Sequence, residues 1–153
     1  MIYAVLFFGI ILLDQITKAV VEANKVHVTV IEDIFSISIT RNEGAAFSML
    51  HNQDWAQTFF IIITVLILIG FCIYLIFTRK QSKFFMVSSI MVMGGAVGNF
   101  IDRVALKSVR DFIDVHFFAN FNVADVFICV GAFLLALYFL FIDEDAIFAK
   151  RKQ

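Results

Sequence analysis

The sequence lacks proline altogether and has little charge, since only 16% of its 153 residues are Asp, Glu, Lys or Arg. A soluble domain is about 25% charged and about 45–50% apolar, whereas this chain is 61% apolar. Its net charge of −1 offers no basic surface for nucleic acid, so no nucleic-acid partner is expected. The length predicts one domain, and the composition predicts a membrane protein.

Cysteine is also scarce. Cys72 and Cys129 stand in apolar runs without a CxxC neighbour, which indicates neither a disulfide framework nor a zinc site. We expect two buried free thiols that behave as small apolar side chains. His27, His51 and His116 lack the spacing of metal ligands, so we expect no metal and no other cofactor.

Long apolar runs, by contrast, are abundant. A helix rises about 1.5 Å per residue, so about 20 apolar residues cross the hydrocarbon core of a bilayer. The first run carries Asp14 and Lys18 and has no basic residue before Lys18, which favours a retained anchor over a cleaved signal peptide. The runs predicted to be transmembrane helices are residues 2–22, 56–77, 84–104 and 124–142.

Basic residues predict the orientation of these helices. The turn at 78–83 holds three Lys or Arg residues, and the tail at 150–152 holds three more. The longer connections at 23–55 and 105–123 hold two each. Because basic clusters face the cytoplasm, both termini are expected inside and both longer connections outside.

The first outer connection contains two stretches of alternating apolar residues. "VHVTV" at 26–30 and "FSISIT" at 35–40 flank the turn-like "IED". Strict alternation predicts strands, here a two- or three-stranded sheet in an outer region of about 24–50. The expected fold is therefore an all-α membrane protein with four transmembrane helices and a small extracytoplasmic β-sheet region.

Charged residues inside these helices are costly and suggest function. Asp14 and Lys18 are four residues apart and share a helical face, either as a self-contained ion pair or as a brace for a polar site. The third run ends in "GGAVGNFIDRV", whose glycines allow close helix packing. Arg103 at its end either extends to the interface or fixes a carboxylate or a peptide carbonyl.

The connection before the fourth run holds three carboxylates. Asp125 is at the third helical position after Asn122, which predicts a capping role at the helix start. Asp111 and Asp114 have the position of ordinary loop acids. In the first connection, Asn42 is most simply a turn residue.

In the expected orientation, most of these polar residues lie at the outer membrane face. A transporter needs polar groups through the whole membrane thickness, so this distribution favours a surface site. Two carboxylates held close together share a proton and can perform aspartic peptidase chemistry. The alternatives are a small transporter or proton-conducting protein that uses Asp14, Asp102 and Asp125, and a non-catalytic membrane assembly factor.

Five blocks along the chain carry a resemblance to a known family. They are "DQITK" at 14–18, "NEGAAFS" at 42–48, "GGAVGNFIDR" at 94–103, "VRDFID" at 109–114 and "FNVAD" at 121–125. In these blocks the sequence resembles the lipoprotein signal peptidases, also called signal peptidase II. The blocks have the order of the family and extend over the chain.

The resemblance implies an aspartic endopeptidase of the bacterial inner membrane with its active site at the outer face. Its substrates would be prolipoproteins, cut just before a cysteine that carries diacylglycerol, with membrane lipid as surroundings and globomycin as an inhibitor. The catalytic residues implied are Asp111 and Asp125, with Asp114 as a bystander. The implied substrate-binding or supporting residues are Asp14, Lys18, Asn42, Gly44, Asn99, Arg103 and Asn122.

Overall fold

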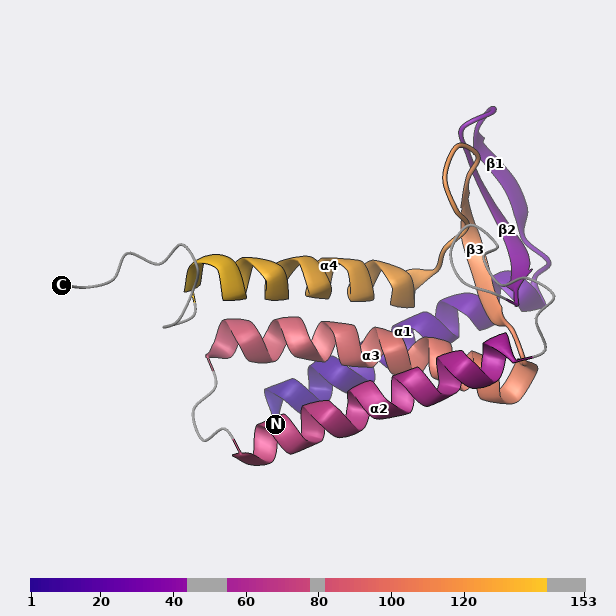
Figure 1. The fold of residues 1–153 in the computed structure, drawn as a ribbon. Helices are drawn as coiled ribbons and strands as arrows, with labels where there is room; N and C mark the ends of the chain where they lie inside the picture. Colours follow the sequence, from indigo (N-terminus) through magenta and orange to yellow (C-terminus); the bar gives the residue numbers. More distant parts are fainter. Residues whose placement is uncertain (44–54, 78–81, 143–153) are drawn as a thin grey trace.

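The computed structural model describes residues 1–43, 55–77 and 82–142 of the chain. Within these residues, four long helices lie side by side and a three-stranded antiparallel sheet stands at one end of them (Figure 1). The elements in chain order are α1 (Ile2–Ala23), β1 (His27–Ile31), β2 (Phe35–Asn42), α2 (Ala56–Phe77), α3 (Lys83–Leu106), β3 (Val109–Val115), α4 (Val123–Leu137) and the π-helix η2 (Tyr138–Ile142).

The helices have the length and the apolar surface of membrane spans. All four, with η2 continuing α4, are long and apolar enough to cross a bilayer. Side chains such as Phe8, Ile62 and Phe133 point outward and are exposed. A surface of this kind matches the hydrocarbon core of a bilayer rather than water. The fold class predicted from the sequence is therefore confirmed.

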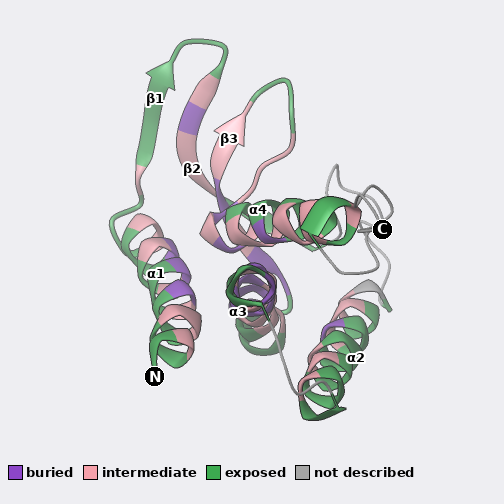
Figure 2. Cartoon of the chain, turned by 90° about the vertical axis from the view of Figure 1, so that its left-hand side faces the viewer, coloured by how far each residue is buried: buried purple, intermediate pink, exposed green. Residues whose placement is uncertain are grey.

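Helix α3 is the central helix of the bundle. In the most apolar stretch of α3, 50% of the residues are buried, whereas in the corresponding stretches of α2 and α4 only 6% are buried. Figure 2 shows α1, α2 and α4 arranged around it. Side chains on α3 can therefore reach groups on several other elements, which matters for the polar site described below.

Two glycines allow the close packing that the sequence predicted. A Cβ on Gly95 would lie 2.4 Å from the carbonyl oxygen of Ala124, at the start of α4. A Cβ on Gly98 would lie 2.7 Å from Oδ2 of Asp14, on α1. Both separations are shorter than any side chain tolerates, so these glycines bring α1 and α4 against α3.

The two cysteines differ from the prediction in one respect. Cys72 and Cys129 are free, as expected, but they are exposed rather than buried. Outward positions of a membrane helix are as apolar as inward ones, because lipid tails are as apolar as leucine side chains. Hydropathy alone therefore does not distinguish a thiol in the core from one that faces lipid.

The sheet has the strand order β1-β2-β3, with both pairs antiparallel. The predicted strands and the turn between them are present, but the third strand comes from residues 109–115 and not from the expected 24–50 region. Hydrophobic alternation in "VRDFIDV" is interrupted by charged residues, so periodicity did not reveal it. Asp111 and Asp114 are consequently strand residues rather than loop residues.

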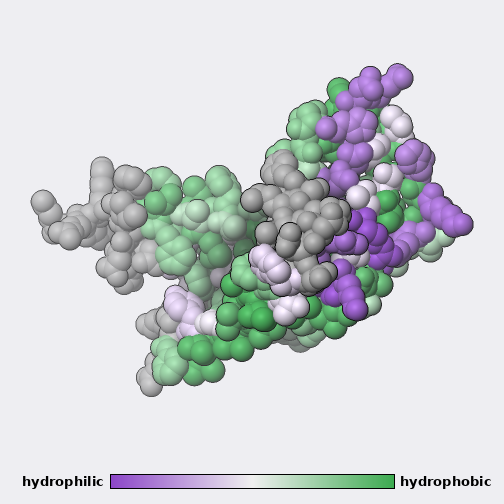
Figure 3. Space-filling model, turned by 45° about the vertical axis from the view of Figure 1, so that its right-hand side comes forward, coloured by the Kyte–Doolittle hydropathy of each residue, from purple (hydrophilic) through white to green (hydrophobic). Residues whose placement is uncertain are grey.

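In its middle the sheet presents a row of apolar residues on one face and a row of polar residues on the other. Opposite residues in antiparallel strands point to the same face, and Val28, Ile37 and Ile113 are aligned across the three strands. Thr29, Ser36 and Asp114 form the neighbouring row on the other face. Figure 3 shows hydrophilic residues gathered over the sheet and the adjoining helix ends, whereas the helices below are hydrophobic.

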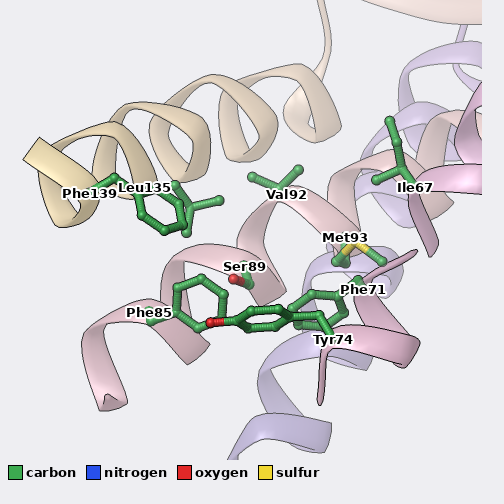
Figure 4. A pocket seen from close by; sticks show the side chains of 9 residues that line it. All are labelled: Ile67, Phe71, Tyr74, Phe85, Ser89, Val92, Met93, Leu135 and Phe139. Carbon is green, nitrogen blue, oxygen red and sulfur yellow. The ribbon is translucent and has the colours of Figure 1, made fainter. Parts of the chain in front are cut away.

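An apolar pocket of about 290 Å³ lies between α2, α3 and α4 (Figure 4). On α3 it is lined by Phe85, Ser89, Val92 and Met93, in the first half of the helix. Ser89 and Asn99 are ten residues apart, or about 15 Å along the helix axis. The pocket is therefore separate from the polar end of the bundle. Its remaining lining residues are Ile67, Phe71, Tyr74, Leu135 and Phe139.

Candidate active site

Among the described residues, the buried carboxylate, ammonium and amide side chains gather where the helices meet the sheet. Fully buried side chains are usually apolar, yet the largest fully buried ones here include a lysine, three aspartates and an asparagine. They come from three elements and the cap of α4, so the fold and not the local sequence brings them together. By element they are Asp14 and Lys18 on α1, Asn99 and Asp102 on α3, Asp111 on β3, and Asn122 at the cap of α4, with Asn42 on β2 close by.

Asp111 is held on β3 by two side-chain amides. Its side chain is buried, with 1% of the residue exposed. Nδ2 of Asn42 donates to Oδ2 at 2.8 Å, and Nδ2 of Asn122 donates to Oδ1 at 2.7 Å. Burial raises the pKa of Asp111 to about 6, and the negative charge of Asp125 contributes to the rise, while the hydrogen bonds from Asn42 and Asn122 oppose it. The carboxyl group can therefore hold or release a proton near neutral pH.

Asp125 lies in the first turn of α4 and has a capping function. Asn122 accepts a hydrogen bond from the backbone N–H of Asp125, while Asp125 Oδ2 accepts one from the backbone N–H of Asn122, each at 3.0 Å. This is the reciprocal arrangement of a capping box, and it confirms the predicted cap. Oδ1 of Asp125 accepts a further hydrogen bond from Nδ2 of Asn99 at 2.7 Å.

Asn122 joins the two carboxylates into one site. Its side chain donates to Asp111, and its backbone donates to Asp125. Each of the four carboxylate oxygens accepts a hydrogen bond from an amide. The structure therefore brings together the two residues predicted to be catalytic, with Asn42, Asn99 and Asn122 around them.

A network of buried charges lies behind this pair. Nζ of Lys18 is 2.8 Å from Oδ2 of Asp14 and 3.3 Å from Oδ2 of Asp102, and all three side chains are fully buried. Oδ1 of Asp14 accepts the backbone N–H of Ala124 at 3.0 Å, which ties α1 to the start of α4. Of the two interpretations of Asp14 and Lys18, the brace between helices is the one the structure supports.

Arg110 connects this network to the sheet and was missed in the sequence. Its backbone and side chain donate to Asp102, and its guanidinium also contacts Glu22 and Gln15 on α1. The hydrogen bond to Asp102 raises the pKa of Arg110 above its usual value. Strand alternation places Arg110 and Asp111 on opposite sides of β3, so recognition of the strand would have revealed it.

Arg103 stacks on an aromatic ring beside the site. Its Cζ lies 4.8 Å from the ring centroid of Phe60 on α2, a cation–π contact. Its Nε is buried and has no hydrogen-bond partner among the described residues. The contact with Phe60 thus fixes the orientation of the guanidinium.

Of the other predicted residues, Asp114 stands apart from the pair. Asp114 accepts a hydrogen bond from Ser36 at 3.0 Å and lies 3.4 Å from Nε2 of His116. Gly44 lies outside the described residues. Within the residues that the structure describes, no group of three or more His, Cys, Asp and Glu residues could hold a metal ion.

The fold and the site define an integral membrane protein with a carboxylate pair at one end of a four-helix bundle. The family model for signal peptidase (SPase) II matches residues 6–141. The chain therefore belongs to the signal peptidase II family, a family of peptidases.

Curated relatives carry the same designation. The lipoprotein signal peptidase of Geobacter metallireducens is 42% identical over 134 residues, which is 83% of each chain. The lipoprotein signal peptidase of Clostridioides difficile is 38% identical over 95% of this chain and 99% of its own. Family membership disfavours the alternative of a transporter or proton-conducting protein.

Solved structures share the fold. One bacterial membrane enzyme superposes with a TM-score of 0.83 at 32% identity, over 99% of this chain and 93% of the other. A second bacterial membrane enzyme gives a TM-score of 0.80 at 30% identity, over 90% of this chain and 92% of the other. The chain is thus a multi-pass bacterial membrane protein.

Proposed function

We propose that the chain is an aspartic endopeptidase that removes signal peptides from bacterial prolipoproteins, cutting just before a diacylglyceryl cysteine. Membership of the signal peptidase II family supports the substrate class. The observation that supports the aspartic mechanism is the pair of the buried Asp111 and the half-buried Asp125, whose carboxyl groups both accept hydrogen bonds from Asn122. A pair of this kind binds one proton readily and two negative charges only at a cost.

Asp111 and Asp125 activate a water molecule between them. The ionised carboxylate takes a proton from the water as the water oxygen attacks the scissile carbonyl carbon. The protonated carboxyl group donates to the carbonyl oxygen, where negative charge develops. The proton taken from water then passes to the leaving nitrogen as the C–N bond breaks. The pair titrates as a unit, so either aspartate can begin as the base.

The surrounding amides and the arginine position the reacting groups. Asn42, Asn99 and Asn122 hold the carboxyl oxygens in place through hydrogen bonds of 2.7–2.8 Å. The guanidinium of Arg103, held against the ring of Phe60, donates to a carbonyl of the substrate backbone. Fixed orientation of this kind lowers the barrier because the geometry is set before the reaction begins.

The reaction takes place at the outer face of the inner membrane. In the structure, α1 begins and η2 ends at the same end of the bundle, opposite the sheet and the carboxylate pair (Figure 1). The basic clusters that follow α2 and η2 in the sequence, at 78–83 and 150–152, support a cytoplasmic location for that end. The diacylglyceryl chains of the substrate then lie in the lipid, which presents the scissile bond at the membrane surface.

Cleavage of a lipidated substrate tests this function. The purified protein is incubated with a diacylglyceryl-modified prolipoprotein, with the same prolipoprotein without the lipid, and with globomycin. We expect cleavage of the lipidated form, little cleavage of the unlipidated form and inhibition by globomycin. Cleavage that is lost on chelation of metal ions and retained in Asp111→Asn would contradict the aspartic mechanism.

A further inference from the structure

Lys18 carries a buried charge that has no role in the proposed mechanism. Its Nζ has three oxygen neighbours: Asp14 Oδ2 at 2.8 Å, Asn99 Oδ1 at 3.0 Å and Asp102 Oδ2 at 3.3 Å. An ammonium group has three hydrogens and accepts none, so these three oxygens use its whole capacity. Lys18 therefore acts through its neighbours and not on a substrate.

Asn99 is the neighbour that leads to the carboxylate pair. Its Oδ1 accepts from Lys18 and also from Nδ2 of Asn122 at 3.1 Å, while its Nδ2 donates to Asp125 at 2.7 Å. The partners of an amide decide which end is oxygen and which is nitrogen. A flipped amide would turn its nitrogen towards the Lys18 ammonium and its oxygen towards the Asp125 carboxylate, and both contacts would repel.

We propose that Lys18 is a positioning residue that locks the Asn99 amide in the orientation in which it donates to Asp125. This inference rests on the proposed function, because Asp125 has to be one of the reacting carboxyl groups. The ammonium and the carboxylate lie at opposite ends of one amide, and both hydrogen bonds are charge-assisted. The lock holds Asp125 in place for the attack on the scissile bond.

Lys18 also has a structural role that an experiment has to separate from this one. It balances the buried carboxylates of Asp14 and Asp102, and Asp102 is balanced by Arg110 as well. Loss of the lysine charge leaves these carboxylates less well compensated and costs stability. Two substitutions remove that charge equally but differ in hydrogen bonding: Lys18→Gln keeps a donor for Asn99, and Lys18→Met does not.

The first comparison is turnover of the lipidated prolipoprotein by wild type, Lys18→Met and Lys18→Gln. We expect Lys18→Met to lower kcat about 10- to 100-fold with KM changed less than about threefold, as for a misplaced reacting group. Lys18→Gln should retain several-fold more activity than Lys18→Met. Equal losses in the two variants would overturn the inference, because a role in charge balance alone predicts equality.

The second comparison is a double-mutant cycle with Asn99→Ala. If Lys18 acts through Asn99, Lys18→Met should lower kcat no more than about twofold further in the Asn99→Ala background. If Lys18→Met lowers kcat by the same factor in the Asn99→Ala background as in wild type, the two residues act independently and the inference is overturned. Unfolding temperatures are measured for every protein. If Lys18→Met does not fold, the Lys18 variants are compared in the Asp102→Asn background, where the loss of one negative charge offsets the loss of the lysine charge. Absence of cleavage by wild type would instead refute the proposed function itself.

Discussion

The carboxylate of Asp14 accepts a hydrogen bond from the backbone N–H of Ala124 at 3.0 Å, although the two residues are 110 positions apart. Ala124 follows Asn122 and precedes Asp125, so a residue of α1 fixes the turn of α4 from which Asp125 projects. The same carboxylate pairs with Lys18. Asp14 thus links the stability of the bundle to the geometry of the site.

Asp14→Ala should therefore reduce both stability and activity. The substitution removes the acceptor for Ala124 and leaves the Lys18 ammonium with one carboxylate partner fewer. Breaking a buried ion pair from one side costs about 3–5 kcal/mol. Thermal unfolding in detergent measures the loss, with Glu32→Ala in the exposed turn between β1 and β2 as the control. Equal unfolding temperatures in the two variants would contradict this role.

Asp111→Asn and Asp125→Asn should each abolish cleavage and leave folding intact. An amide has the size of a carboxyl group but neither takes a proton from water nor shares one with its neighbour, so we expect a loss of at least about 100-fold in kcat. Asp114→Asn is the matched control, because Asp114 contacts Ser36 and His116 instead of the pair. Cleavage is followed by the mass of the product, and substantial activity of Asp111→Asn would refute the assignment.

The sequence predicted the helices and the cap of α4, and the family resemblance implied the residues of the candidate site, but neither revealed the role of Arg110. Helix limits follow from length and hydropathy, which the membrane imposes on each segment separately. The cap of α4 is equally local, since Asn122 and Asp125 interact across three positions. Such features could be predicted because they depend on neighbouring residues alone.

The contacts of Arg110 show what could not be predicted. Its partners Gln15, Glu22 and Asp102 lie on two helices that are remote in sequence. In the sequence Arg110 counted only as one basic residue of an outer connection. Its role depends on the pairing of β3 with β2, a tertiary feature that carries no local periodic signal.

Gly95→Ala should destabilise the bundle, whereas Gly70→Ala should not. A Cβ at Gly95 would lie 2.4 Å from the Ala124 carbonyl oxygen, and at Gly70 it would meet nothing within 4 Å. Overpacking of this kind costs about 1–3 kcal/mol, while alanine in an open helical position gains about 0.5–1 kcal/mol over glycine. Thermal unfolding of both variants measures the difference. A similar effect at the two sites would contradict the close approach of α3 and α4.

The pH dependence of stability should reveal the raised pKa of Asp111. Its pKa rises from the ordinary 3.8 to about 6 in the folded protein, chiefly through burial. Between these values the folded state binds more protons than the unfolded state, so the free energy of unfolding falls as pH rises from about 4 to about 6. The full rise corresponds to at most about 3 kcal/mol.

Asp111→Asn lacks this titration, so its stability relative to wild type should increase over the same interval. Unfolding of both proteins at pH 4, 5, 6 and 7 measures the difference, and a constant difference would show that Asp111 titrates alike in both states.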